Sequence, residues 1–159
     1  MIMVDVQSTV AGAPPAPRVR RTLNRAASVA GLRASEVSVL FCADARMRTL
    51  NRRYRGRDRT TDVLAFPAAP GAAPAPGGFL GDIVISVPYA SREARRRDDT
   101  RAREIDRLLV HGFLHLMGYD HETDEGQMDA LEGRLRRRMG LATGSTAAKP
   151  APTRGGSRR

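Results

Sequence analysis

The sequence is poor in the residues that lock many small extracellular folds. It has no tryptophan, aromatic residues make up 4% of the chain, and Cys42 is the single cysteine. One cysteine cannot form an internal disulfide, which excludes the disulfide-stapled secreted domains. The apolar neighbours of Cys42 indicate a buried thiol, and the core must be built from Leu, Val, Ile, Ala and Met.

Long hydrophobic runs and targeting signals are also lacking. No stretch approaches the roughly 20 apolar residues of a membrane-spanning helix. The start, MIMVDV, has neither the basic segment nor the long apolar run of a signal peptide. We therefore expect a cytoplasmic protein with no membrane partner.

Histidine is scarce, and its placement is the strongest signal in the chain. All three histidines fall within HGFLHLMGYDH, at His111, His115 and His121. On a helix, the first two share one face with Cβ atoms roughly 5–6 Å apart. Gly118 permits a left-handed helix end, so the chain can turn back and bring His121 to the same ion. Three imidazoles with an open fourth position are typical of catalytic zinc, so we predict one Zn²⁺ per chain, although nickel, cobalt or iron would also fit.

Other interpretations of this segment compete with a catalytic metal. A histidine on an apolar face is often a buried core residue, although three at this spacing are harder to explain that way. The spacing also matches the long metalloprotease signature. Gly112 stands where that signature has its general-base glutamate, and glycine cannot accept a proton, so peptide hydrolysis loses its base. Finally, the metal could be a structural staple in an RNA-binding ribosome-assembly factor, which would need a fourth protein ligand.

Positive charge dominates the chain, whose formal net charge is +10 with nearly all basic residues being arginine. Such a charge favours a polyanionic partner, and the arginine fork suits phosphate. The densest run, RRYRGRDR, holds Arg53, Arg55, Arg57 and Arg59, which we predict to bind nucleic acid. Alternatively, part of the charge lies on solvated helix faces and in the tail.

Periodicity predicts an α+β fold, with a small mixed sheet of about four strands packed with helices and the metal site on a helix and its following turn. Residues 1–141 form one catalytic domain with a Pro/Ala/Gly loop at 67–78, and 142–159 form a disordered basic tail. Asp44, Thr100 and Thr123 are candidate helix caps. The expected strands are 2–6, 36–42, 63–66 and 83–87, and the expected helices are 18–30, one from 44, one from 88, 100–116 and one from 123 to 139.

Three stretches together resemble the YbeY family of bacterial metal-dependent endoribonucleases. They are HGFLHLMGYDH, the run LNRRYR leading into TDVLAFP, and LGDIVIS, and the resemblance covers about residues 36–140. It implies a single-strand-specific endoribonuclease acting in 16S ribosomal RNA 3′-end maturation and ribosome quality control. It also implies ribosomal RNA, as the small-subunit precursor, and the small ribosomal subunit with its proteins as partners. The oligomeric state stays open.

The resemblance also implies roles for single residues. Arg55 matches a functionally important arginine of the family, and we predict Arg55 and His111 to be the catalytic residues. Arg55 would hold the scissile phosphate or stabilise charge developing on it. A metal-activated water or the ribose 2′-hydroxyl could then attack, and the sequence leaves both routes open. From their places beside strands, Asp62 and Asp82 could each accept a hydrogen bond from a ligand imidazole, or could equally cap a turn or pair with an arginine. Ala65 stands where the family usually has serine.

Overall fold

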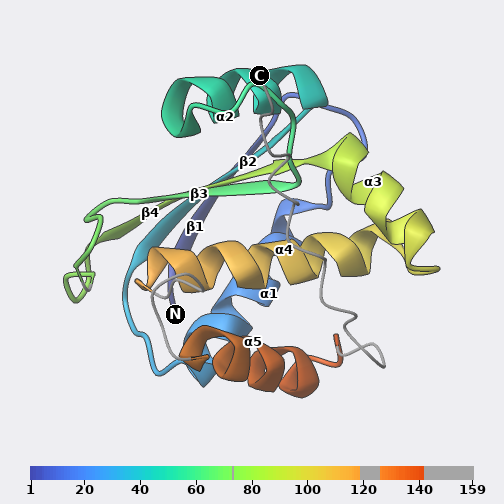
Figure 1. The fold of residues 1–159 in the computed structure, drawn as a ribbon. Coiled ribbons are helices and arrows are strands. Elements are labelled where there is room, and N and C mark those ends of the chain that lie inside the picture. Colours follow the sequence, from blue (N-terminus) through green and yellow to red (C-terminus); the bar gives the residue numbers. More distant parts are fainter. Residues whose placement is uncertain (73, 119–125, 142–159) are drawn as a thin grey trace.

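One four-stranded sheet organises the structure (Figure 1). The computed structural model describes residues 1–72, 74–118 and 126–141. The strand order is β1-β2-β4-β3, in which β1, β2 and β4 are parallel and β3 is antiparallel to β4. This mixed sheet with its helices confirms the predicted α+β class. The strands are β1 (Met3–Ser8), β2 (Glu36–Cys42), β3 (Val63–Pro67) and β4 (Phe79–Ser86).

Helices cover both faces of the sheet. In Figure 1, α2 lies on one side of the strands, and α1, α4 and α5 lie on the other. The helix that carries His111 and His115, α4, lies between the sheet and α5. The helices are α1 (Ala16–Val29), α2 (Asp44–Arg55), α3 (Val87–Arg96), α4 (Arg101–Leu116) and α5 (Gln127–Arg138).

Alternation along the strands divides the core between the two faces, because successive side chains of a strand point in opposite directions. Val39, Phe41 and Ile83 belong to the main cluster together with residues of α1, α4 and α5. Cys42 and Val84 belong to a smaller cluster with Met47 of α2. Cys42 is fully buried, as predicted, and burial raises the pKa of its thiol, which makes it unreactive.

Two glycines let α4 lie unusually close to β4. A Cβ atom on Gly112 of α4 would lie 2.9 Å from Cγ2 of Ile83 in β4. Gly81 of β4 has a φ of +138°, and a Cβ atom there would overlap the Phe66 carbonyl oxygen and lie 2.9 Å from Cδ2 of Leu116. The histidine-bearing half of α4 is therefore pressed onto the strand at two points where a side chain would not fit.

Buried charges anchor the first half of α4, a feature that periodicity did not predict. Arg107 is 2% exposed and is paired with Asp99 and with Glu104. The Asp106 carboxylate accepts hydrogen bonds from Arg18 and Thr22 of α1. A buried charge costs free energy unless it is paired, so these contacts fix where α4 lies on its neighbours.

The predicted helix break near 98–100 is confirmed, and Thr100 caps α4 by accepting from the Arg103 amide at 3.2 Å. The capping role predicted for Asp44 is wrong. The N-cap of α2 is Ala43, and no side chain caps that helix. The Asp44 carboxylate instead accepts hydrogen bonds from distant side chains, as described below. Thr123 lies outside the described residues.

Several predicted element boundaries are displaced. β4 begins at Phe79, four residues before the predicted start, and the predicted strand's last residue, Val87, opens α3 instead. Pro67, placed in the loop by prediction, is the last residue of β3. Among the residues described, no helix has the length and apolarity needed to cross a membrane. The single catalytic domain and the disordered tail at 142–159 stay predictions, since the tail is outside the described residues.

Replacing Gly112 by alanine should destabilise the protein by about 1–3 kcal/mol, because the added methyl group overpacks the contact with Ile83. Gly133→Ala is the matched control on α5, where the added Cβ would meet only the mobile end of Arg137. That change should stabilise by roughly 0.5–1 kcal/mol, the ordinary gain for a helical glycine. Urea unfolding followed by circular dichroism measures both. Equal stabilisation by the two substitutions would contradict the close approach of α4 to β4.

Candidate active site

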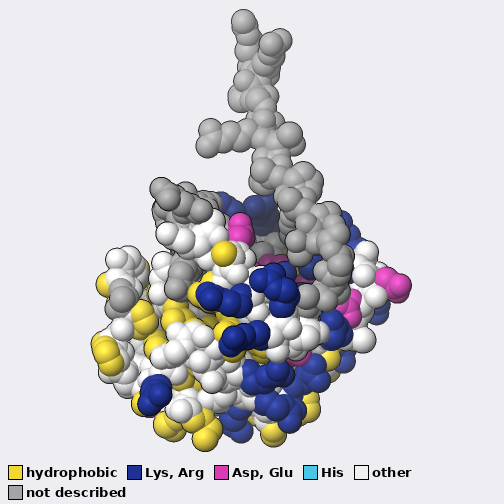
Figure 2. Space-filling view, turned by 90° about the horizontal axis from the view of Figure 1, so that it is seen from below, with side chains coloured by type: hydrophobic (Ala, Val, Ile, Leu, Met, Phe, Trp, Pro, Cys, Tyr) yellow, Lys and Arg dark blue, Asp and Glu magenta, His cyan; other side chains and the backbone are white. Residues whose placement is uncertain are grey.

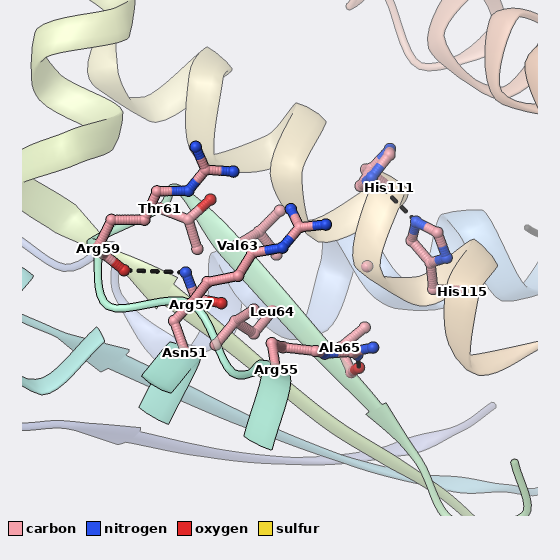
Figure 3. A pocket seen from close by; sticks show the side chains of 11 residues that line it. Asn51, Arg55, Arg57, Arg59, Thr61, Val63, Leu64, Ala65, His111 and His115 are labelled. Carbon is pink, nitrogen blue, oxygen red and sulfur yellow. Dashed lines mark hydrogen bonds between the residues drawn. The ribbon is translucent and has the colours of Figure 1, made fainter. Parts of the chain in front are cut away.

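A cleft of about 470 Å³ brings together the two groups of residues singled out from the sequence. Arg55, Arg57 and Arg59, from the end of α2 and the loop after it, lie on one side. His111 and His115 of α4 lie on the other, as Figure 3 shows. Val63, Leu64 and Ala65 of β3 line the cleft between these two groups. Residues some 50–60 positions apart in the sequence therefore face one space.

The two imidazoles have the geometry of a shared cation site. Nε2 of His115 lies 3.1 Å from Nε2 of His111, and the rings are inclined at 75°. Two nitrogens at ~2.0–2.1 Å from a tetrahedral zinc ion would be roughly 3.3 Å apart. The nitrogen donors and their spacing fit a zinc ion, and both histidines line the cleft. The pair results from the i, i+4 spacing on α4, as predicted.

The third predicted ligand, His121, lies outside the described residues, as do Tyr119 and Asp120. Within 1–72, 74–118 and 126–141, no group of three or more histidine, cysteine or carboxylate side chains is arranged so that it could hold one metal ion. The described part of the site thus contributes two nitrogen donors, and the part of His121 stays a prediction.

Gly112, between the two histidines, also lines the cleft. Its contact with Ile83 explains why no side chain stands where the metalloprotease signature has glutamate. Ile83 of β4 occupies the space into which a side chain at position 112 would extend, so a glutamate could not be accommodated there without moving α4. This packing argues against peptide hydrolysis by the metalloprotease mechanism.

Arg55 is held against β3 by a backbone group. Its Nη2 donates a hydrogen bond of 2.7 Å to the carbonyl oxygen of Ala65, and its guanidinium lies 5.6 Å from the Phe66 ring centroid. The backbone of residue 65 makes this contact, so the alanine found where the family usually has serine does not prevent it. A guanidinium has five N–H donors, which leaves capacity for a phosphate.

Buried Asn51 shapes the arginine loop. Its side-chain amide donates to the backbone carbonyl oxygen of Arg59 at 2.9 Å, and its backbone carbonyl oxygen accepts from the backbone N–H of Arg57 at 3.3 Å. Sequence analysis did not single out Asn51, because an asparagine within a helix carries no distinctive signal. Arg53, predicted to bind nucleic acid, is not among the residues that line the cleft, and its guanidinium lies 5.4 Å from the Tyr54 ring.

Positive charge extends beyond the cleft. Figure 2 shows Lys and Arg side chains gathered on the face seen from below, the side on which α5 lies in Figure 1. Part of the +10 charge therefore lies on solvated helix faces, as the alternative interpretation held. Among the helices on this side, α1 has exposed arginines at Arg20, Arg21 and Arg25, and α5 has them at Arg134, Arg137 and Arg138.

The two aspartates considered as partners of a ligand imidazole have other surroundings. Asp62 accepts hydrogen bonds from the Val63 amide at 2.8 Å and from the Thr61 hydroxyl, which is the pattern of a turn residue. Asp82 is exposed on β4. Among the described residues, a carboxylate that does meet a histidine is that of Glu132 of α5, whose Oε2 lies 3.4 Å from Nδ1 of His111. Sequence analysis missed it because it lies 21 residues further along the chain, beside an ordinary apolar stripe.

Asp44 ties the start of α2 to the rest of the fold. One carboxylate oxygen accepts from the hydroxyls of Thr60 at 3.1 Å and Ser86 at 2.9 Å, and the other accepts from Arg92 at 2.7 Å. These hydrogen bonds, that from Arg92 foremost, lower the pKa of Asp44. These contacts hold the start of α2 against β4 and α3, and α2 in turn carries Arg55 and the loop with Arg57 and Arg59.

The comparisons with known protein sequences point to a single family. The family model described as endoribonuclease YbeY matches residues 12–140. Endoribonuclease YbeY of Anaeromyxobacter sp. is 43% identical over 140 residues, covering 85% of this chain and 71% of that protein. Endoribonuclease YbeY of Moorella thermoacetica is 48% identical over 120 residues, covering 70% and 76%. The chain belongs to the YbeY family.

A solved structure supports the fold alone. The solution structure of TM1509 from Thermotoga maritima matches with a TM-score of 0.59 and 23% sequence identity, covering 92% of this chain and 99% of that one. At that identity the match confirms the α+β architecture and leaves the roles of single residues to the site itself.

Replacing Asp44 by asparagine should destabilise the protein at neutral pH. A carboxylate whose folded pKa is lowered contributes its full stability above its unfolded pKa of about 3.9 and loses it as the pH falls through the folded value. The difference in unfolding free energy between wild type and Asp44→Asn should therefore shrink as the pH falls below about 4.

Asp58→Asn is the matched control for this experiment. Arg48 also lowers the pKa of Asp58, but both side chains are more than half exposed, and such pairs contribute little. Urea unfolding at pH 7 and pH 3 measures both variants. An Asp44→Asn effect no larger than that of Asp58→Asn, or independent of pH, would contradict the role given to Asp44.

Proposed function

We propose that this chain is a metal-dependent endoribonuclease that cleaves single-stranded RNA in the cleft between the arginine loop and α4. Endoribonuclease is the activity that names the YbeY family, and ribosomal RNA maturation is the family's role. The observation that carries the assignment is the pair of imidazole nitrogens 3.1 Å apart facing a wall of arginines. A cation-binding side and a phosphate-binding side within one cleft suit a phosphodiester.

The finer parts of the proposal concern the metal and the substrate. We assign one zinc ion per chain, held by His111, His115 and His121, of which His121 is included for its spacing. The substrate is the small-subunit ribosomal RNA precursor, cleaved in 16S 3′-end maturation and ribosome quality control in the cytoplasm. The small ribosomal subunit and its proteins are the proposed partners.

The three cleft arginines would bind different phosphates of the RNA. Arg55, held by the Ala65 carbonyl, is the residue that we place at the scissile phosphate. Arg57 and Arg59, on the loop fixed by Asn51, bind neighbouring phosphates. Guanidinium groups suit this work because they stay charged and present paired N–H donors.

Bound zinc would supply a Lewis acid beside the phosphate and would lower the pKa of a nearby water molecule. Among the described residues that line the cleft there is no aspartate or glutamate to act as a base. The attacking group is then a water molecule or the ribose 2′-hydroxyl, and Arg55 stabilises the charge that develops on the phosphate. Analysis of the product ends separates the two routes, since 2′-hydroxyl attack leaves a cyclic phosphate.

His115→Ala should abolish both the bound metal and RNA cleavage, because it removes one of the facing nitrogens. Arg55→Ala should retain the metal and lower kcat roughly 10²–10³-fold, as expected for the loss of a donor to transition-state charge. Arg33→Ala, at an exposed arginine outside the cleft lining, is the control and should leave kcat near wild type. Metal analysis and cleavage of a single-stranded RNA test all three. Full cleavage by a metal-free His115→Ala protein would refute the proposal.

The phosphate contacts should also appear in the salt dependence of RNA binding. For single strands, each phosphate contact contributes about 0.7 to the slope of log K against log salt. Arg57→Ala and Arg59→Ala should each lower the magnitude of that slope by roughly this amount, and the control Arg33→Ala should not. Fluorescence anisotropy with a labelled RNA, in the presence of a chelator that prevents cleavage, gives the slopes. An unchanged slope for both cleft variants would remove them from the RNA path.

A further inference from the structure

Glu132 is a buried carboxylate placed between the histidine pair and an arginine. It lies on α5 and is 7% exposed, and its Oε2 lies 3.4 Å from Nδ1 of His111 on α4. Its other oxygen, Oε1, accepts a hydrogen bond from Arg136, one turn further along α5. Burying a carboxylate is unfavourable unless both oxygens find donors, and here each oxygen faces a nitrogen.

The contact fixes which nitrogen of His111 carries the proton. An ionised carboxylate only accepts hydrogen bonds, and the Arg136 guanidinium compensates its charge. Nδ1 of His111 must therefore be the N–H donor to Glu132. In a neutral imidazole the other nitrogen, Nε2, then keeps its lone pair, and Nε2 is the atom that lies 3.1 Å from Nε2 of His115 at the cleft.

We propose that Glu132 is a positioning residue for the metal site, which holds His111 in its Nδ1–H tautomer and aims Nε2 at the cation. Arg136 in turn orients Glu132. This inference rests on the proposed function, because it concerns the same site. It adds α5 to the elements that build the centre, although no part of α5 lines the cleft.

A purely structural role makes a different prediction. Glu132 and Arg136 are four residues apart and would form a pair on any helix surface. If that pair alone mattered, losing it would affect stability and leave the imidazole unchanged. The chain offers a matched pair for comparison: Glu93 of α3 is also 7% exposed and is paired with Arg96 at 2.9 Å.

The first experiment measures metal affinity in the full chain with two variants of similar volume. Glu132→Met removes the acceptor and fills the space, and should weaken Zn²⁺ binding roughly 10–100-fold, the usual cost of losing such a partner. Glu132→Gln keeps an acceptor oxygen and should stay closer to wild type. Glu93→Met, the control, should not change the affinity. Competition with a chromophoric chelator gives the dissociation constants, and thermal unfolding of the metal-free proteins checks the fold.

The second experiment needs neither metal nor cleavage. Nitrogen-15 NMR of histidine-labelled, metal-free protein reports the tautomer of His111, and the chain has only three histidines to assign. His111 should be predominantly Nδ1–H in the wild type and in Glu132→Gln, and should lose that preference in Glu132→Met.

Unchanged zinc affinity in Glu132→Met, or an unchanged His111 tautomer, would overturn the role of Glu132 while leaving the endoribonuclease proposal intact. An affinity loss of equal size in Glu93→Met would overturn it as well, since any lost buried pair would then have the same effect. A wild-type protein that binds no metal would instead refute the metal centre itself, and the tautomer measurement would separate that failure from the failure of the Glu132–His111 contact.

Discussion

The site depends on the close packing of Gly112 against Ile83. Because no side chain separates α4 from β4 at that point, the helix lies on the strand, and the two histidines that flank Gly112 are held at a fixed depth in the cleft. Gly81 repeats the arrangement in reverse, with the glycine on the strand and Leu116 on the helix. A metal site needs ligand positions fixed to about 0.5 Å, and a helix packed on a sheet at two such points provides that rigidity.

The cleft arginines differ from several other arginines of the fold in what holds them. Arg48, Arg92 and Arg107 form ion pairs with Asp58, Asp44 and Asp99, respectively, so a carboxylate of the same chain compensates each positive charge. The cleft arginines are held differently: Arg55 donates to a backbone carbonyl, and the loop bearing Arg57 and Arg59 is held by the Asn51 amide. In the part of the chain that the structure describes, no ion pair of these three is found. Carbonyl contacts orient a guanidinium without neutralising it, which preserves its charge for a polyanion.

Local patterns in the sequence predicted local features, and contacts between distant segments account for what was missed. The facing of His111 and His115 follows from helix periodicity alone. Aspartate is a residue type that often caps helices, but Ser86 and Arg92, more than 40 residues away in the sequence, donate hydrogen bonds to the Asp44 carboxylate instead. The start of β4 was missed because Gly81 weakens the strand signal after a Pro/Ala/Gly run. Glu132 reaches His111 only once α5 packs on α4, and no short-range pattern reports that packing.

Both walls of the cleft are fixed, and this bears on the kind of RNA that can enter. The histidine side belongs to a helix packed on β4, and the arginine side belongs to a loop held by Asn51 and, through Asp44 and Thr60, by the start of α2. Since both walls are tied to the rest of the fold in this way, we expect the substrate to supply the adaptation. A single strand can rotate its backbone to bring one phosphate between the arginines and the imidazoles, whereas a duplex holds its phosphates in a set geometry. Rigid walls thus favour flexible RNA, and selection among single strands would fall to the phosphates and bases next to the scissile bond.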